Sequence, residues 1–193
     1  MKNKNKGFKL VELIIVIAIF AILLGIAVPS LNSILGFRVN RAANSIAAAL
    51  DKTKTEASNR LVGEMKLEKR EDGYYISYYL DRGKSEVKQD QPEKIAPART
   101  IISYTTDNGT EQELAVGDSI VLTYDRATGA FLPLQDKVWK QKEILSVLAD
   151  GKDIPLTRSG AYCTKITVRG GGRYKTLNLI QETGKYEITS GHN

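Results

Sequence analysis

Residues 7–28 read GFKLVELIIVIAIFAILLGIAV, and this stretch decides the fold of the chain. Every residue from Leu13 to Val28 is apolar or glycine. The 21 residues Phe8–Val28 would form a helix about 31 Å long, which matches the roughly 30 Å hydrocarbon core of a bilayer. Glu12 lies near the start of this helix, and a carboxylate in hydrocarbon is costly unless a partner offsets its charge. The stretch therefore predicts a membrane helix with one residue that needs a partner.

Lysines surround the start of the apolar run, at positions 2, 4, 6 and 9. The positive-inside rule keeps such an N-terminus cytoplasmic and sends the rest of the chain across the membrane. A secretory signal peptide also starts with positive charge and an apolar stretch. Its cleavage site would have to lie near Gly25–Ser30, where no A-x-A pattern stands.

The helical pattern continues beyond the apolar run. Apolar residues recur at spacings of three and four, with charged residues between them, so we expect an amphipathic helix. Pro29 should kink the helix, because proline removes one backbone hydrogen bond and clashes with the preceding turn. We therefore predict one bent helix from about Phe8 to about Arg60, whose second half needs a surface to cover its apolar face. That face consists of Val39, Ala42, Ala43, Ile46, Leu50, Ala57 and Leu61.

The rest of the chain alternates short strand patterns with turn signals, which predicts an antiparallel sheet. The expected fold class is α+β, with the long helix packed on this sheet. A polar loop is expected over Asp81–Pro97 and a short helix over Asp136–Ala149. The expected strands are Val62–Arg70, Tyr74–Leu80, Arg99–Thr105, Glu113–Leu114, Ser119–Tyr124, Ala130–Leu134, Tyr162–Arg169, Tyr174–Ile180 and Tyr186–Thr189.

Composition gives little support for a nucleic-acid partner. The net charge is +6, from 28 basic and 22 acidic residues, and Lys2, Lys4 and Lys6 supply three of those charges. The single cysteine, Cys163, excludes an intramolecular disulfide. Its strand-like surroundings favour a buried small side chain, with an intermolecular disulfide or a reactive thiol as the alternatives.

The sequence shows no catalytic constellation, so we expect a protein that is not an enzyme and has no cofactor or metal. The single histidine, His192, stands beside the C-terminus, where chains are usually disordered. No metal-ligand cluster has a recognised spacing. Arg169-Gly170-Gly171-Gly172-Arg173 is interpreted as a turn between strands. Alternatively, Arg169 and Arg173 form a basic patch with Lys165 and Lys175 that contacts phosphate.

Gly7, Phe8 and Glu12, followed by the apolar run, resemble the N-terminus of type IV pilins and of type II secretion pseudopilins. The resemblance implies cleavage between Gly7 and Phe8 by a prepilin peptidase and N-methylation of the new Phe8 amine. It also implies that Glu12 pairs with the amine of a neighbouring subunit and sets the filament register. Pro29 matches the helix-kinking proline of the family. Lys9 departs from the usual threonine, and its side chain could reach the headgroups or compete with the amine for Glu12.

The C-terminal half resembles the group of minor pseudopilins that comprises pseudopilin H of type II secretion and the fimbrial T proteins. The residues that carry this resemblance are Tyr124–Gly129, the strand Ile166–Val168 that leads to Gly172-Arg173, and Thr183-Gly184. The stretch 133–158 has no counterpart in that group and is interpreted as an insertion.

Together these features predict a leader at 1–7, a helix at 8–61 and a β-rich head at 62–193. Within the helix, 8–28 would be transmembrane and 29–61 amphipathic. The resemblance implies a non-enzymatic minor pilin or pseudopilin, anchored by a single pass in the cytoplasmic membrane with its head outside, and later part of a periplasmic or extracellular filament. Its partners would be other pilin subunits, the prepilin peptidase and the inner-membrane assembly platform. The alternative function is a filament-tip module that captures DNA or a surface.

Overall fold

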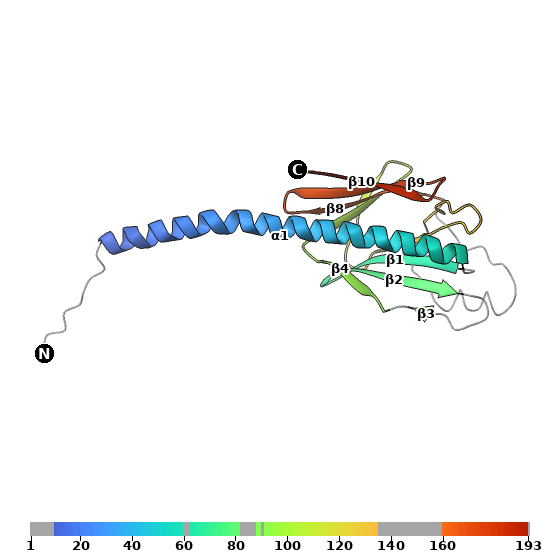
Figure 1. The fold of residues 1–193 in the computed structure, drawn as a ribbon, viewed down its shortest axis with the longest axis horizontal. Helices are drawn as coiled ribbons and strands as arrows, with labels where there is room; N and C mark the ends of the chain where they lie inside the picture. The colour runs from blue at the N-terminus through green and yellow to red at the C-terminus, as the bar shows by residue number, and fades with distance from the viewer. Residues whose placement is uncertain (1–9, 60–61, 82–87, 90, 135–159, 193) are drawn as a thin grey trace.

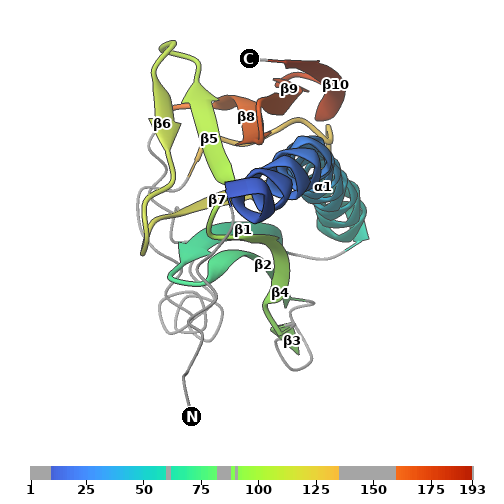
Figure 2. The same cartoon turned by 90° about the vertical axis from the view of Figure 1, so that its left-hand side faces the viewer.

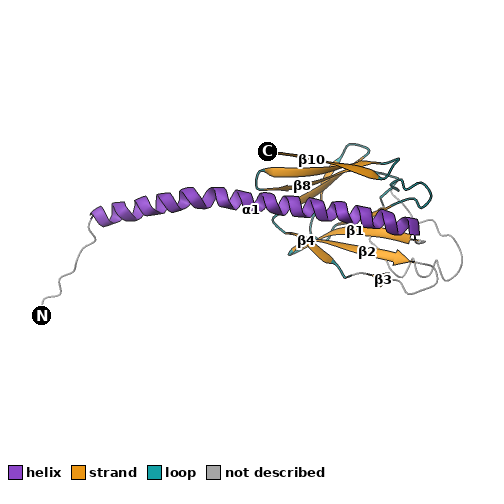
Figure 3. Ribbon diagram, in the orientation of Figure 1, coloured by secondary structure: helices purple, strands orange, loops and turns teal. Residues whose placement is uncertain are grey.

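The computed structural model describes residues 10–59, 62–81, 88–89, 91–134 and 160–192, with side chains at all of these except 26–35, 62, 80–81 and 88–89. Within them, one long helix, α1 (Leu10–Asn59), is followed by antiparallel strands (Figure 1, Figure 3). The helix projects far beyond the strands at its N-terminal end. This arrangement confirms the α+β class with a pilin-like layout.

The strands form two sheets where the sequence predicted one. The first sheet has the order β3-β2-β1-β7, with β4 also paired to β2, and the second has the order β10-β9-β8-β5-β6. The chain leaves the first sheet after β4, returns to it for β7, and then completes the second. The first sheet contains β1 (Val62–Arg70), β2 (Gly73–Asp81), β3 (Lys88–Gln89), β4 (Glu93–Pro97) and β7 (Ser119–Thr123). The second contains β5 (Ile101–Thr106), β6 (Glu111–Glu113), β8 (Cys163–Gly170), β9 (Arg173–Ile180) and β10 (Lys185–His192).

The C-terminal half of α1 lies between the two sheets, with β1 and β2 on one side and β8, β9 and β10 on the other (Figure 2). Six of the seven residues predicted for its apolar face are buried, which confirms the amphipathic pattern; Leu61 lies outside the described residues. Ala47, Ala49 and Thr53 are buried as well, because two sheets cover a wider arc of the helix than one. The Thr53 hydroxyl meets its hydrogen-bonding need by donating to the Ala49 carbonyl at 2.7 Å.

Most of the expected strands are present, and neighbouring ones pair as hairpins. β1 pairs with β2 around a turn at Glu71-Asp72, and β5 pairs with β6 around Asp107–Gly109. The strands predicted at 162–169, 174–180 and 186–189 correspond to β8, β9 and β10. The short strand expected over Ala130–Leu134 is reduced to one bridge, between Phe131 and Tyr124.

Two further sequence predictions were wrong. The polar loop expected over Asp81–Pro97 contains β3 and β4, and Ile95 and Ala96 of β4 are buried. β4 is an edge strand, which tolerates Pro97 because its outward N–H positions need no partner. His192 was expected in a disordered tail, yet it belongs to β10 and pairs with Arg173. The short helix expected over 136–149 and all but the first two residues of the insertion 133–158 lie outside the described residues.

Candidate functional site

The N-terminal half of α1 presents apolar side chains on all its sides. Leu10 is 74% exposed, Phe20 58% and Ile22 65%. A helix that is hydrophobic all round requires an apolar environment or partner. Burial of such surface contributes roughly 25 cal/mol for each Å² removed from water. The described stretch Leu10–Gly25 is therefore a large exposed apolar surface that is available for contact with lipid or protein. It is the first element of the candidate site.

Glu12 lies in the first turn of α1 and is exposed. The N-terminus of a helix carries partial positive charge, which favours a carboxylate at that position. Gly7, Phe8 and Lys9 lie outside the described residues. The helix continues through Pro29 without a break and curves gently in Figure 1. The roles predicted for Gly7, Phe8, Lys9 and Glu12, and the kink at Pro29, stay predictions.

Within the part of the chain whose side chains are described, no helix has an apolar stretch long enough to cross a membrane. The span predicted for 8–28 extends beyond those residues at both ends.

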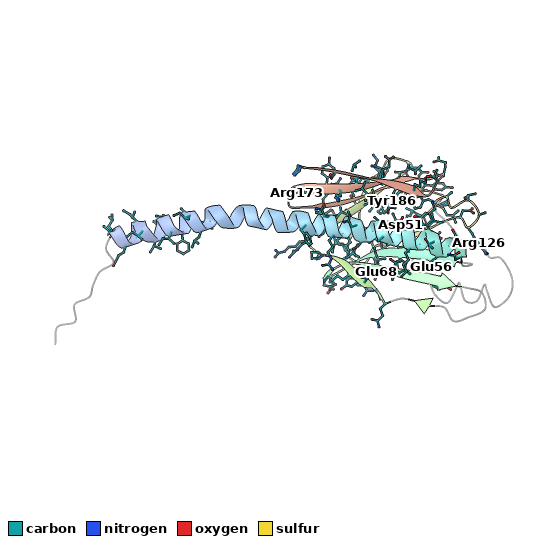
Figure 4. The ribbon with its side chains drawn as sticks, in the orientation of Figure 1. Asp51, Glu56, Glu68, Arg126, Arg173 and Tyr186 are labelled. Atoms are coloured by element: carbon teal, nitrogen blue, oxygen red, sulfur yellow. The ribbon has the colours of Figure 1, made fainter. Side chains whose placement is uncertain are left out.

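The head is joined to the helix by hydrogen bonds as well as by apolar packing. Tyr186 of β10 donates its hydroxyl to Asp51 of α1 at 2.8 Å (Figure 4), and the same hydroxyl lies 3.4 Å from the Ala47 carbonyl oxygen. Burial and the bond to Asp51 raise the pKa of the Tyr186 phenol to about 12. The phenol therefore stays protonated at neutral pH and remains a donor.

Two turns that are distant in sequence meet over Lys54 of α1. The Lys54 ammonium donates to the carbonyl oxygens of Thr183 and Gly184, at 2.7 and 3.3 Å. A Cβ on Gly184 would collide with the Gly129 carbonyl oxygen, so the turns touch through their backbones. Gly129 and Gly184 adopt φ angles of 71° and 57°, which glycine reaches without strain.

The turn before Gly129 is organised by Asp125. Its carboxylate accepts from the Thr128 backbone N–H at 2.7 Å and from the Thr128 hydroxyl at 2.8 Å. These bonds lower the pKa of the Asp125 carboxyl. The two turn motifs quoted for the minor pseudopilin resemblance are thus parts of one contact with the helix. The sequence shows the two turn motifs but does not reveal the hydrogen bonds of Lys54, Asp51 and Tyr186. Those bonds join side chains and backbone on elements that are far apart in the sequence.

The helix approaches β1 closely at Gly63. A Cβ built on Gly63 would lie 2.6 Å from the Ala57 nitrogen and 2.9 Å from its Cα. Only glycine at this position lets the last turns of α1 pack directly on the first strand. This contact holds the end of α1 directly against the first strand of the head.

Arg169 and Arg173 do not form one basic patch. Partners across a sheet share a face, and faces alternate along a strand. Arg173 pairs with Gly170, and Arg169 pairs with Tyr174, so the two arginines point to opposite faces of the second sheet. Arg169 forms an ion pair with Glu111 at 2.5 Å, and this contact lowers the pKa of the Glu111 carboxyl. The phosphate contact and the DNA-capture alternative stay predictions, and the two arginines would have to act separately.

Lys165 and Lys175 divide in the same way. Lys165 shares the outer face with Arg169, whereas Lys175 pairs with Val168, which is buried toward the helix. The sequence placed all four cations near one glycine turn, but strand alternation separates them into two pairs.

Cys163 is 4% exposed and forms no disulfide, which confirms the prediction of a small buried side chain. Burial raises the pKa of its thiol to about 12. The thiolate is the nucleophilic form of cysteine, so this thiol is poorly reactive. Over the described stretches of the chain, no group of three or more His, Cys, Asp and Glu residues is arranged to hold a metal ion.

Comparison with known proteins supports the N-terminal pattern. Residues 2–28 match the prokaryotic N-terminal methylation motif. This motif is a type IV pilin-like prepilin signal, and it supports a pilin or pseudopilin family, processing by a prepilin peptidase and association with other pilin subunits. It points to a structural subunit that begins as a membrane-anchored precursor and then enters a filament. No curated protein and no solved structure matches the chain.

Proposed function

We propose that this chain is a minor pilin or pseudopilin, a non-enzymatic subunit of a type IV pilus or a type II secretion-like filament. The division of α1 carries this proposal. Its N-terminal half exposes apolar side chains all round, whereas its C-terminal half is buried between two sheets. The buried half attaches the head to the helix. The exposed half remains available to bind the bilayer first and other subunits later.

The proposed assembly pathway has two stages. The precursor inserts in the cytoplasmic membrane by a single pass over 8–28, with its lysine-rich leader inside and its head outside. The prepilin peptidase cleaves between Gly7 and Phe8, and the new Phe8 amine is methylated. The inner-membrane assembly platform then moves the helix from lipid into the filament core, where apolar packing between helices replaces contacts with lipid.

Glu12 has a specific part in this assembly. After cleavage, the amine of Phe8 carries a positive charge, and a carboxylate at Glu12 of a neighbouring protomer can offset it. A buried ion pair can add little net stability and still specify alignment, because each misaligned arrangement leaves a charge buried without a partner. The pair would therefore set the axial register of the filament.

Incorporation of variants into filaments tests this function. Glu12→Val should insert in the membrane normally, since it removes a charge from an apolar helix, but it should enter sheared filaments in reduced amount. Leu13→Val, an apolar exchange at the adjacent position, serves as the control and should incorporate like the wild type. Normal incorporation of Glu12→Val would defeat the register role, and absence of the wild-type chain from filaments would defeat the proposed function.

A further inference from the structure

Basic side chains gather at the neck of the molecule, the point where the exposed half of α1 enters the head. Arg38 and Arg41 come from α1. Arg173 comes from the start of β9 and is labelled in Figure 4. Arg173 lies against Gly36 of the helix: a Cβ there would be 2.8 Å from its Cδ and 2.9 Å from its Nη1. Arg173 therefore lies along the same short section of the helix as Arg38 and Arg41, but on the opposite face, and it does not line the cavity described next.

A cavity of about 370 Å³ opens at this neck, between α1 and β4. Arg38, Arg41 and Lys94 supply its charged lining, and Ile95, Ala96 and Pro97 supply its apolar lining. Ile95 and Ala96 are 5% and 3% exposed, so this apolar side is a fixed part of the core. No described residue that lines the cavity is acidic.

Two of the three cations in the cavity have no counter-charge among the described residues. Lys94 forms an ion pair with Asp72 at 2.6 Å, and this contact raises the pKa of Lys94 and lowers that of Asp72. Arg38 and Arg41 form no hydrogen bond or ion pair with any residue that the structure describes. They stand three residues apart, so their side chains share one face of the helix. The cavity therefore offers two guanidinium groups to an anion.

We propose that this cavity binds the phosphate of an anionic phospholipid headgroup at the outer surface of the membrane. Guanidinium groups present forked N–H donors that match phosphate oxygens. The apolar lining suits the carbon atoms of the glycerol that joins the phosphate to its acyl chains. The site would hold the head against the bilayer before the subunit is assembled into the filament.

The position of the cavity along α1 favours a lipid as its ligand. This step rests on the proposed function. With Phe8–Val28 across the hydrocarbon core, Arg38 stands ten residues, about 15 Å of helix, beyond the outer edge of that core. The long arginine side chain can extend back along the helix toward the outer headgroups. Phe37 is 68% exposed beside Arg38, so its apolar ring is available to contact lipid next to the cavity.

Spin-labelled lipids test the proposal. The full mature chain is reconstituted in phosphatidylcholine vesicles, and its insertion is checked first by co-flotation. Electron paramagnetic resonance then compares the motionally restricted fractions of spin-labelled phosphatidylglycerol and phosphatidylcholine. We expect a preference for phosphatidylglycerol of about fivefold or more, since each basic residue at a membrane surface contributes about that factor. Arg38→Gln with Arg41→Gln should abolish the preference, and Arg38→Lys with Arg41→Lys should restore part of it.

A matched control removes two charges elsewhere. Arg126→Gln with Lys185→Gln changes exposed residues, and Arg126 lies at the end of the head opposite the neck (Figure 4). This variant should keep the preference of the wild type. An equal loss in both double variants, or no preference in the wild type, would overturn the proposal. Displacement of the labelled lipid by millimolar inorganic phosphate would also overturn it, by assigning the cavity to free phosphate.

The same experiment separates the two proposals. A wild-type chain that fails to float with neutral vesicles contradicts the membrane-anchored subunit itself. A chain that floats but does not select the anionic lipid contradicts only the headgroup site.

Discussion

The hydroxyl of Tyr186 donates a 2.8 Å hydrogen bond to the carboxylate of Asp51, and so joins the last strand of the chain to the buried half of its only described helix. The two residues are 135 positions apart. Asp51 lies on the exposed side of the buried half of α1. This hydrogen bond, called the polar clamp below, therefore lies at the edge of the apolar contact between α1 and the second sheet. The second sheet is thus held on the helix by both kinds of interaction.

Alkaline pH should weaken this clamp. Burial and the bond to Asp51 raise the pKa of Tyr186 from 10.0 to about 12, so the folded chain binds this proton more tightly than the unfolded chain does. The contribution of Tyr186 to stability is therefore full below pH 10 and is lost as the pH rises toward 12. Urea unfolding of the full chain in neutral detergent at pH 8 and pH 11 should show a smaller loss of stability for Tyr186→Phe than for the wild type.

Asp51→Asn is the second variant for this measurement. It keeps an acceptor for the phenol but removes the negative charge, so the loss of stability with pH should shrink without vanishing. Tyr124, whose pKa is raised chiefly by its burial, leaves a background pH dependence in all these variants. Identical pH dependence for the wild type and Tyr186→Phe would refute the clamp.

Glycine at position 63 should be required for stability. A Cβ there would lie 2.6 Å from a backbone atom of Ala57, which cannot move without shifting the helix. We expect Gly63→Ala to cost about 1–3 kcal/mol of unfolding free energy, the usual range for overpacking. Gly25→Ala is the matched control, because no atom beyond its chain neighbours and the nearby helix backbone lies within 4 Å of its Cβ position. Urea denaturation checks both, and equal midpoints would argue against the close helix–strand contact.

Cys163 should not react in the folded protein. The side chain is 4% exposed, so a reagent has little access to it. Because its pKa is raised to about 12, very little of the thiol is in the reactive thiolate form at pH 8. Labelling with a thiol reagent should follow global unfolding across a urea titration and be nearly absent in native buffer. Rapid labelling of the native chain, or a disulfide-linked dimer on a non-reducing gel, would contradict this assignment.

The long helix and most hairpins could be predicted, because their signals are local. The apolar residues at 39, 42, 43, 46, 50 and 57 repeat with the helical period, and all of them are buried. The turns at Glu71-Asp72, followed by Gly73, and at Asn108-Gly109 carry the residues that such turns require. In each case the information lies within a few positions of the residue concerned.

The two-sheet arrangement and the edge strand β4 could not be predicted, because they depend on pairings between distant segments. β7 pairs with β1, and β5 pairs with β8, across long separations in sequence. The stretch 93–97 has only Ile95 and Ala96 as its buried residues, and this pattern is too short to distinguish a strand from a loop. The separation of Arg169 from Arg173 follows from strand register, which the glycine-rich turn between them does not reveal.

The mature N-terminus tests the central claim, that this chain is a processed filament subunit whose helix is its working part. The chain is expressed with its prepilin peptidase, purified from membranes, and its N-terminal peptide is analysed by mass spectrometry. Our account predicts a chain that starts at Phe8 with a methylated amine, and a Gly7→Val variant that retains the leader. An intact Met1 in the wild type, or cleavage near Ser30, would contradict it.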